Sequence, residues 1–135
     1  MHYLEAFKQI NNEFSPNLIF FGHTYETRDW VPRLSANLDV PFISDCIAYN
    51  TSGNKINLIR PIYQAKLSQE LELTSDKAIV SFQAGSFSID DIESGNTNSS
   101  TFSCKLDSVK SSIRPGEKFT ETSGGVDLTS AELIV

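Results

Sequence analysis

A short apolar run at residues 18–21 (LIFF) stands between two segments whose apolar residues recur at helical spacing. Turn residues bound the run on both sides, with Pro16 and Asn17 before it and Gly22 after it. A continuous apolar run of this length is typical of a strand that is covered on both of its faces. Because both neighbouring segments have helical periodicity, the pattern predicts an α/β fold.

The first helix is expected over residues 2–14, with one buried stripe. A second helix is expected after the strand, with Asp29 as its N-cap and an end near Leu38. Pro32 then takes the third helical position, where a missing amide hydrogen does little harm. Residues 39–41 (DVP) are expected to stop this second helix.

From Phe42 onward apolar and polar residues alternate, which is the period of a strand with one face in water. We expect strands near residues 43–49, 55–62, 65–73 and 78–83. Short polar turns separate these segments, so they are predicted to pair as an antiparallel meander. Together with the buried strand, they predict a mixed sheet.

Polar residues dominate the stretch 94–100 (SGNTNSS), which is expected to be a mobile loop because it buries too little apolar surface to order itself. Two further extended segments are expected near residues 101–107 and 111–121. A loop from Gly124 is then expected to lead into an apolar strand that is cut off at Val135.

Charge and cysteine content exclude several classes of function. Eleven basic and seventeen acidic side chains give a net charge of −6, which argues against nucleic-acid and anionic-membrane partners. Cys46 and Cys104 lack C-x-x-C spacing and have only two histidines as companions, too few for a structural zinc site. The acidic residues Asp90, Asp91 and Glu93 do not match a calcium-binding loop. No metal site is therefore expected, and no apolar run reaches the roughly 20 residues of a membrane span.

The corner between the strand and the second helix is the first candidate site. Gly22, His23 and Thr24 directly follow a strand, where open α/β sheets bind phosphates and small ligands. The sequence lacks a phosphate-binding glycine motif. His23 has the chemistry of a general base, but a histidine at a strand end more often hydrogen-bonds a neighbouring loop. With no catalytic constellation in the sequence, we predict that the chain is not an enzyme.

Arg28, Asp29 and Arg33 form a charged group at the expected start of the second helix. Two interpretations stay open: a docking patch or anion contact, or an N-cap with a solvated helix face. Given the net charge, the nearby Tyr25 and Trp30 favour packing over stacking on nucleic-acid bases.

Several short sequence blocks follow one another in a definite order and spacing between Leu4 and Val135. They are Phe21-Gly22-His23-Thr24 with Arg28-Asp29 and Pro32-Arg33-Leu34, Ile43-Ser44-Asp45, Arg60-Pro61-Ile62-Tyr63, Ala84-Gly85-Ser86-Phe87, and Gly125-Val126-Asp127-Leu128 with Ala131-Glu132 and Ile134-Val135. In this order the blocks resemble the alpha subunit of electron-transfer flavoproteins.

The resemblance implies an incomplete N-terminal domain of that subunit, with a Rossmann-like, adenine-nucleotide-hydrolase-like fold. Residues 1–122 would be this partial α/β domain, and residues 123–135 a linker and first strand leading to an absent FAD-binding domain. The full protein would carry electrons from dehydrogenases to an acceptor through FAD, which is held outside this segment. No cofactor is then expected on this chain alone.

By the same resemblance, the segment would be a scaffold and subunit interface. Expected partners are the flavoprotein beta subunit and, through the full complex, dehydrogenases and electron acceptors. The interface candidates are Arg28, Asp29, Arg33, Arg60 and Tyr63. The alternative is a small adenine-nucleotide-binding module that uses the loop from Gly22 to Asp29. The expected compartment is the cytoplasm, or the mitochondrial matrix in a eukaryotic source.

Three positions depart from the family's pattern. Thr27 and Ala65 stand where glycine is common, and Gln83 stands where arginine is common. A lost glycine changes turn geometry, and a lost arginine removes a bidentate donor. We therefore expect the contacts at these positions to differ from those of the family.

Overall fold

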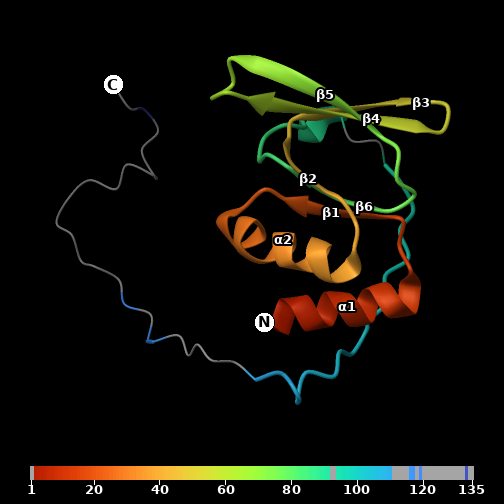
Figure 1. The fold of residues 1–135 in the computed structure, drawn as a ribbon, viewed down its shortest axis with the longest axis vertical. Helices are drawn as coiled ribbons and strands as arrows, with labels where there is room; N and C mark the ends of the chain where they lie inside the picture. Colours follow the sequence, from red (N-terminus) through yellow and green to blue (C-terminus); the bar gives the residue numbers. More distant parts are fainter. Residues whose placement is uncertain (1, 92–93, 111–115, 118, 120–132, 134–135) are drawn as a thin grey trace.

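A computed structural model describes residues 2–91, 94–110, 116, 117, 119 and 133. The described part has three layers: two helices, a parallel sheet in the middle and an antiparallel sheet on the far side (Figure 1). The predicted α/β class, with both parallel and antiparallel strand pairing, is confirmed. The two kinds of pairing occur in separate three-stranded sheets rather than within one mixed sheet.

Helix α1 (His2–Phe14) and strand β1 (Leu18–Gly22) have the positions that the sequence predicted. The apolar stripe of α1 faces the parallel sheet, where the ring centroids of Phe7 and Phe21 lie 5.1 Å apart. Periodicity therefore located both elements correctly, because each has one dominant apolar pattern.

Helix α2 (Tyr25–Leu38) begins earlier than predicted, and the predicted cap at Asp29 is wrong. Thr24 is the N-cap, because its hydroxyl accepts the N–H of Thr27 at 3.2 Å. Asp29 lies within the helix and is exposed to solvent. A threonine and an aspartate both make good caps, so the residue types alone did not decide between them.

Pro32 lies in the interior of α2 rather than at its third position. An interior proline removes one helical hydrogen bond and costs roughly 3 kcal/mol. The neighbouring side chains of Val31 and Leu34 are fully buried, and their burial offsets that cost. The predicted stop is confirmed, since Asp39 ends the helix in a left-handed conformation with a φ of 54°.

The parallel sheet has the strand order β1-β6-β2, with β6 (Ala78–Phe82) between β1 and β2 (Phe42–Cys46). The prediction that residues 78–83 continue the meander is wrong, because β6 pairs in parallel with both neighbours. Local sequence reveals that a strand is buried, but it does not reveal which strand lies beside it.

The antiparallel sheet contains β3 (Ala48–Ser52), β4 (Lys55–Ile62) and β5 (Leu67–Leu73) in that order. The predicted meander is confirmed for β4 and β5. The single strand expected at residues 43–49 is instead split between the two sheets. A shift of register in β2 between Ile43 and Cys46 accompanies this change of direction.

Two buried clusters cover the two faces of the parallel sheet. Val31, Leu34 and Ile79 form the cluster beneath the helices. The second cluster lies between the sheets and consists of Cys46, Leu58 and Val80.

Residues beyond β6 contribute little regular structure among those that are described. A short 3-10 helix spans Ile89–Asp91, and residues 94–100 are exposed and form neither helix nor strand. The mobility of that loop stays a prediction. The segment at residues 101–107, which was expected to be extended, joins neither sheet and instead packs along α1, where Gln9 exchanges hydrogen bonds of 2.8 and 2.9 Å with the Lys105 backbone. The extended segment expected at residues 111–121 and the linker and strand expected at residues 123–135 lie almost entirely outside the described residues.

Candidate functional site at the ends of the parallel strands

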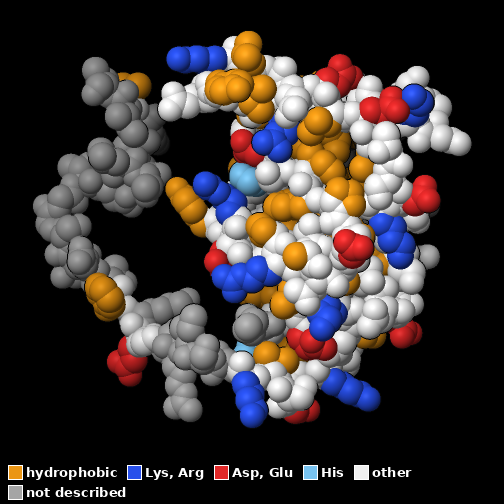
Figure 2. Space-filling view, viewed as in Figure 1, with side chains coloured by type: hydrophobic (Ala, Val, Ile, Leu, Met, Phe, Trp, Pro, Cys, Tyr) orange, Lys and Arg blue, Asp and Glu red, His pale blue; other side chains and the backbone are white. Residues whose placement is uncertain are grey.

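Each parallel strand brings a polar side chain to its carboxyl end. His23 follows β1, Asp45 lies near the end of β2, and Ser81 and Gln83 lie at the end of β6. This edge of an α/β sheet is where ligands bind in related architectures. In the space-filling view, basic, acidic and histidine side chains meet on the flank at which β1 ends (Figure 2). We call His23, Asp45, Ser81 and Gln83 the polar cluster.

Hydrogen bonds connect all four members of the polar cluster. His23 Nδ1 lies 2.9 Å from Ser81 Oγ, and His23 Nε2 lies 3.3 Å from Asp45 Oδ1. Gln83 Nε2 donates to the same aspartate oxygen at 2.9 Å, and the Asp45 N–H donates to Ser81 Oγ at 3.3 Å. With the Ser81 hydroxyl donating to Nδ1 and a proton on Nε2, the His23 ring can make both contacts.

The backbone at Asp45 is left-handed, with a φ of 66°, and lies within the register shift of β2. Aspartate tolerates this conformation better than most residues, and bulges of this kind often aim a side chain at a site. Gln83 holds Asp45 with one neutral donor. The carboxylate is therefore fixed in place without a charged partner from that position.

A histidine between a serine and an aspartate has the composition of a hydrolase triad. Ser81, however, has 0% exposure, so its hydroxyl is out of reach of a substrate in solvent. The His23 side chain is only 15% exposed. The geometry therefore fits a polar tie that joins the ends of three strands better than it fits nucleophilic catalysis.

The predicted ligand loop, Gly22 to Thr24, does connect β1 to the start of α2. The Thr27 hydroxyl donates to the Gly22 carbonyl at 2.7 Å, so this non-glycine position closes the corner. Glu26 places a carboxylate in the first turn of α2, which disfavours an anion at that helix terminus. The corner lies where a ligand would bind, but the Thr24 hydroxyl already accepts the Thr27 N–H and the Thr27 hydroxyl already donates to the Gly22 carbonyl.

Three of the interface candidates lie together on α2. The Arg28 guanidinium lies 5.6 Å from the centroid of the exposed Tyr25 ring. Arg33 Nη2 lies 3.4 Å from Asp29 Oδ1 one turn away, and both side chains are exposed. Exposed pairs of this kind contribute about 0–1 kcal/mol, so these charges are available to a partner at little cost in stability.

Of the other two interface candidates, Arg60 lies in β4 and Tyr63 lies in the turn between β4 and β5. The positive charge of Arg60 affects the buried Cys46 thiol: burial raises the pKa of that thiol, and the Arg60 charge opposes the rise only in part.

Tyr63 is 74% exposed and is the first residue of the β4–β5 turn. Three successive residues of this turn have left-handed φ angles of 51°, 58° and 62°: Tyr63, Gln64 and Ala65. Ala65, a non-glycine residue in this conformation, is therefore strained.

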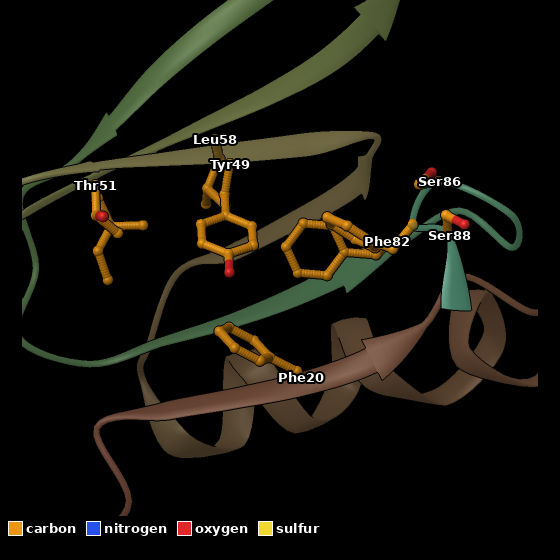
Figure 3. Close-up of a pocket in the computed structure, with 9 residues that line it drawn as sticks. Phe20, Tyr49, Thr51, Leu58, Phe82, Ser86 and Ser88 are labelled. Atoms are coloured by element: carbon orange, nitrogen blue, oxygen red, sulfur yellow. The ribbon is translucent and has the colours of Figure 1, made fainter. Parts of the chain in front are cut away.

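Sequence reasoning missed an apolar groove of about 620 Å³ between the two sheets (Figure 3). The Phe20 ring projects into it from β1, and its centroid lies 5.7 Å from that of Phe82 in β6. The full lining consists of Phe20, Tyr49, Thr51, Ile56, Leu58, Phe82, Ser86, Phe87 and Ser88. Phe20 lies on the opposite face of β1 from Ile19 and Phe21, and this alternation was the available signal.

Comparison with known proteins places the chain in a family. The profile of the electron transfer flavoprotein domain matches residues 2–103. The electron transfer flavoprotein subunit alpha of Bacillus subtilis (strain 168) is 25% identical over 134 residues, covering 98% of this chain and 41% of the relative. The electron transfer flavoprotein subunit alpha of Syntrophomonas wolfei subsp. wolfei is 30% identical over 83 residues, covering 62% of this chain and 26% of the relative.

The chain therefore spans less than half the length of these two relatives. Among the described residues, no helix is long and apolar enough to cross a membrane. The same residues hold no group of three or more His, Cys, Asp or Glu side chains arranged for a metal ion. Since the domain profile covers most of its length, this chain belongs to the electron transfer flavoprotein family, and the relatives that it resembles are alpha subunits.

Proposed function

We propose that the chain is the scaffold and subunit-interface segment of an electron transfer flavoprotein alpha subunit. The whole protein carries electrons from dehydrogenases to an acceptor through FAD that is held outside this segment. The family match over residues 2–103 carries the proposal. The polar cluster supports it, because its side chains bond to one another at the edge where a ligand would otherwise bind.

Two features of the described residues argue against an FAD site among them. The apolar groove is lined by no lysine or arginine, so a diphosphate placed there would lack a cationic partner. The N-terminus of α2 carries Glu26 in its first turn, which repels a phosphate. We therefore assign no cofactor contact and no electron-transfer step to these residues.

Retention of FAD on gel filtration tests where the cofactor is held. The chain is incubated with FAD, separated from free FAD, and its protein peak is scanned for visible flavin absorbance. We expect none, whereas the full-length flavoprotein from Bacillus subtilis serves as the positive control. Stoichiometric FAD in the protein peak of this chain would contradict the proposal.

The interface role is tested by capture of a flavoprotein beta subunit on the tagged chain. We expect the double variant Arg28→Glu, Arg33→Glu to lower capture, since it reverses two exposed charges on α2. Lys110→Glu is the control, because it changes the charge at an exposed residue outside α2. Unchanged capture by the double variant would remove α2 from the interface.

A second candidate function is adenine-nucleotide binding at the loop from Gly22 to Asp29. The observation in its favour is that α2 starts directly after β1 at the carboxyl edge of a parallel sheet. Calorimetric titration with AMP and ATP tests it, and Glu26→Gln should tighten binding if a phosphate lies at the helix terminus. Flat heats with both the parent chain and this variant would eliminate the candidate.

A further inference from the structure

Asn98 differs from the other asparagines of the chain in the residue that follows it. The chain contains nine asparagines: Asn11, Asn12, Asn17, Asn37, Asn50, Asn54, Asn57, Asn96 and Asn98. Only Asn98 precedes a small residue without a β-branch, which is Ser99. A β-branched or long side chain restricts access to the backbone nitrogen of its own residue, whereas serine restricts it little. The Ser99 nitrogen is therefore the least shielded of the backbone nitrogens that follow an asparagine.

Regular structure holds most of the other asparagines but not Asn98. Asn98 lies in the exposed stretch 94–100, which belongs to neither helix nor strand. Among the described residues, neither its side chain nor the Ser99 N–H has a hydrogen-bond partner. Helices and strands contain five of the others, which are Asn11, Asn12, Asn37, Asn50 and Asn57.

The side chain of Asn98 can meet the backbone that follows it. Asparagine side chains in turns and loops commonly contact the backbone N–H groups that come next in the chain. In a helix or a strand, the dihedral angles are fixed and the following N–H is hydrogen-bonded to another backbone group. Neither constraint applies to Asn98, so its side-chain carbonyl carbon can reach the Ser99 nitrogen.

We propose that Asn98 is a modification site at which the folded chain deamidates spontaneously, with water as the only co-reactant. The Ser99 backbone nitrogen attacks Asn98 Cγ and forms a new C–N bond. The bond from Cγ to Nδ2 breaks, and ammonia leaves with the proton that the Ser99 nitrogen gives up. Water then opens the resulting succinimide ring at either carbonyl, which yields aspartate or isoaspartate at position 98. No electron is gained or lost in either step.

The product is compatible with the fold. Deamidation replaces a neutral amide with a carboxylate, so the net charge changes from −6 to about −7. Residues 94–100 are exposed and lie outside both sheets, where chains tolerate covalent change best. The next segment is held to α1 by side chains other than Asn98, with the Phe14 and Phe102 ring centroids 5.5 Å apart. The modified chain should therefore stay folded and accumulate.

Peptide mass spectrometry of the folded chain, incubated at mildly alkaline pH, tests the proposal. We expect a gain of about 1 Da that fragmentation assigns to residue 98, with the aspartate and isoaspartate products separating on chromatography. The rate should rise with pH, because the Ser99 nitrogen must lose its proton. Asn96 is an internal control, since it is equally exposed but precedes the β-branched Thr97, and it should react more slowly.

Two variants separate the roles of the two residues. Asn98→Gln should abolish the mass gain at this position, because glutamine closes the larger ring far more slowly. Ser99→Val should slow it, because a β-branched side chain shields the attacking nitrogen. The matched control is Asn50→Gln in strand β3, which should leave the reaction at Asn98 as it is in the parent.

Addition of urea distinguishes reaction in the folded chain from reaction after unfolding. The rate at Asn98 should hardly change in urea, because the fold does not hold this residue. Absence of the mass gain at residue 98, a rate there no faster than at Asn96, or a large acceleration at Asn98 in urea would each overturn the proposal. Any of these outcomes leaves the proposed flavoprotein role untouched, since that role rests on cofactor and beta-subunit binding.

Discussion

In the parallel sheet, residues 78–81 of β6 are buried, whereas in the antiparallel sheet residues 67–70 of β5 are all exposed. Polar pairs cover the antiparallel sheet, with Asn57 donating to Glu70 at 2.9 Å and Lys55 bonded to Glu72. An antiparallel sheet tolerates one wet face, but a parallel sheet needs cover on both faces. One face of the antiparallel sheet is therefore exposed to water, while the parallel sheet holds the core.

The largest effect is expected from truncating the centre of the parallel sheet. Ile79 is fully buried, so Ile79→Ala should lower the free energy of unfolding by roughly 2–5 kcal/mol through lost burial and a cavity. Urea denaturation measures the change. Leu67→Ala on exposed β5 is the control and should change stability by less than about 0.5 kcal/mol. Equal losses from the two variants would refute the contrast between the sheets.

The next effect concerns the polar cluster. Ser81→Ala removes the hydroxyl that contacts both His23 Nδ1 and the Asp45 N–H, so it should cost roughly 1–3 kcal/mol. Denaturation curves give the loss, and the NMR signals of the His23 ring should shift. Ser68→Ala, at an exposed serine of β5, should do neither. A neutral Ser81→Ala would mean that the cluster does not tie the strands together.

A gain is expected in the β4–β5 turn. Ala65 has a φ of 62°, and glycine adopts that conformation without strain, so Ala65→Gly should stabilise the fold by about 1 kcal/mol. Ala36→Gly, at an exposed position inside α2, is the matched control and should destabilise by about the same amount. Destabilisation by Ala65→Gly would show that the turn is not strained.

The smallest effect belongs to the exposed ion pair of the antiparallel sheet. Lys55→Ala should cost less than about 1 kcal/mol, because the Lys55 and Glu72 side chains are 65% and 44% exposed. Repeating the denaturation at high salt should remove most of the difference, since salt screens surface charges. A loss that persists at high salt would point to a packing role for the Lys55 side chain.

Local pattern predicted the elements of the fold but not their partners. Helix α1 and strand β1 were located because each has a single clear period. The start of α2 was misplaced because Thr24 and Asp29 both have capping side chains, and only the hydrogen bond to Thr27 distinguishes them. β6 was assigned to the meander because no local signal states whether a strand pairs in parallel.

Sequence reasoning found one member of the polar cluster from its chemistry. His23 stood out because it follows a strand, whereas Ser81 lies within a short apolar strand and has no distinguishing pattern. Asp45 entered only through the family resemblance, and its left-handed backbone has no sequence signature beyond the tolerance of aspartate. The cluster forms because three separate strands end at one edge, and that is a property of the tertiary structure.

Residue-resolved hydrogen exchange tests most directly whether the parallel sheet holds the core. The β6 amides of Ile79 and Val80, which lie in the buried strand between β1 and β2, should exchange far more slowly than the amides of residues 67–70 in exposed β5. Equal protection of the two strands, or faster exchange in β6, would contradict this account.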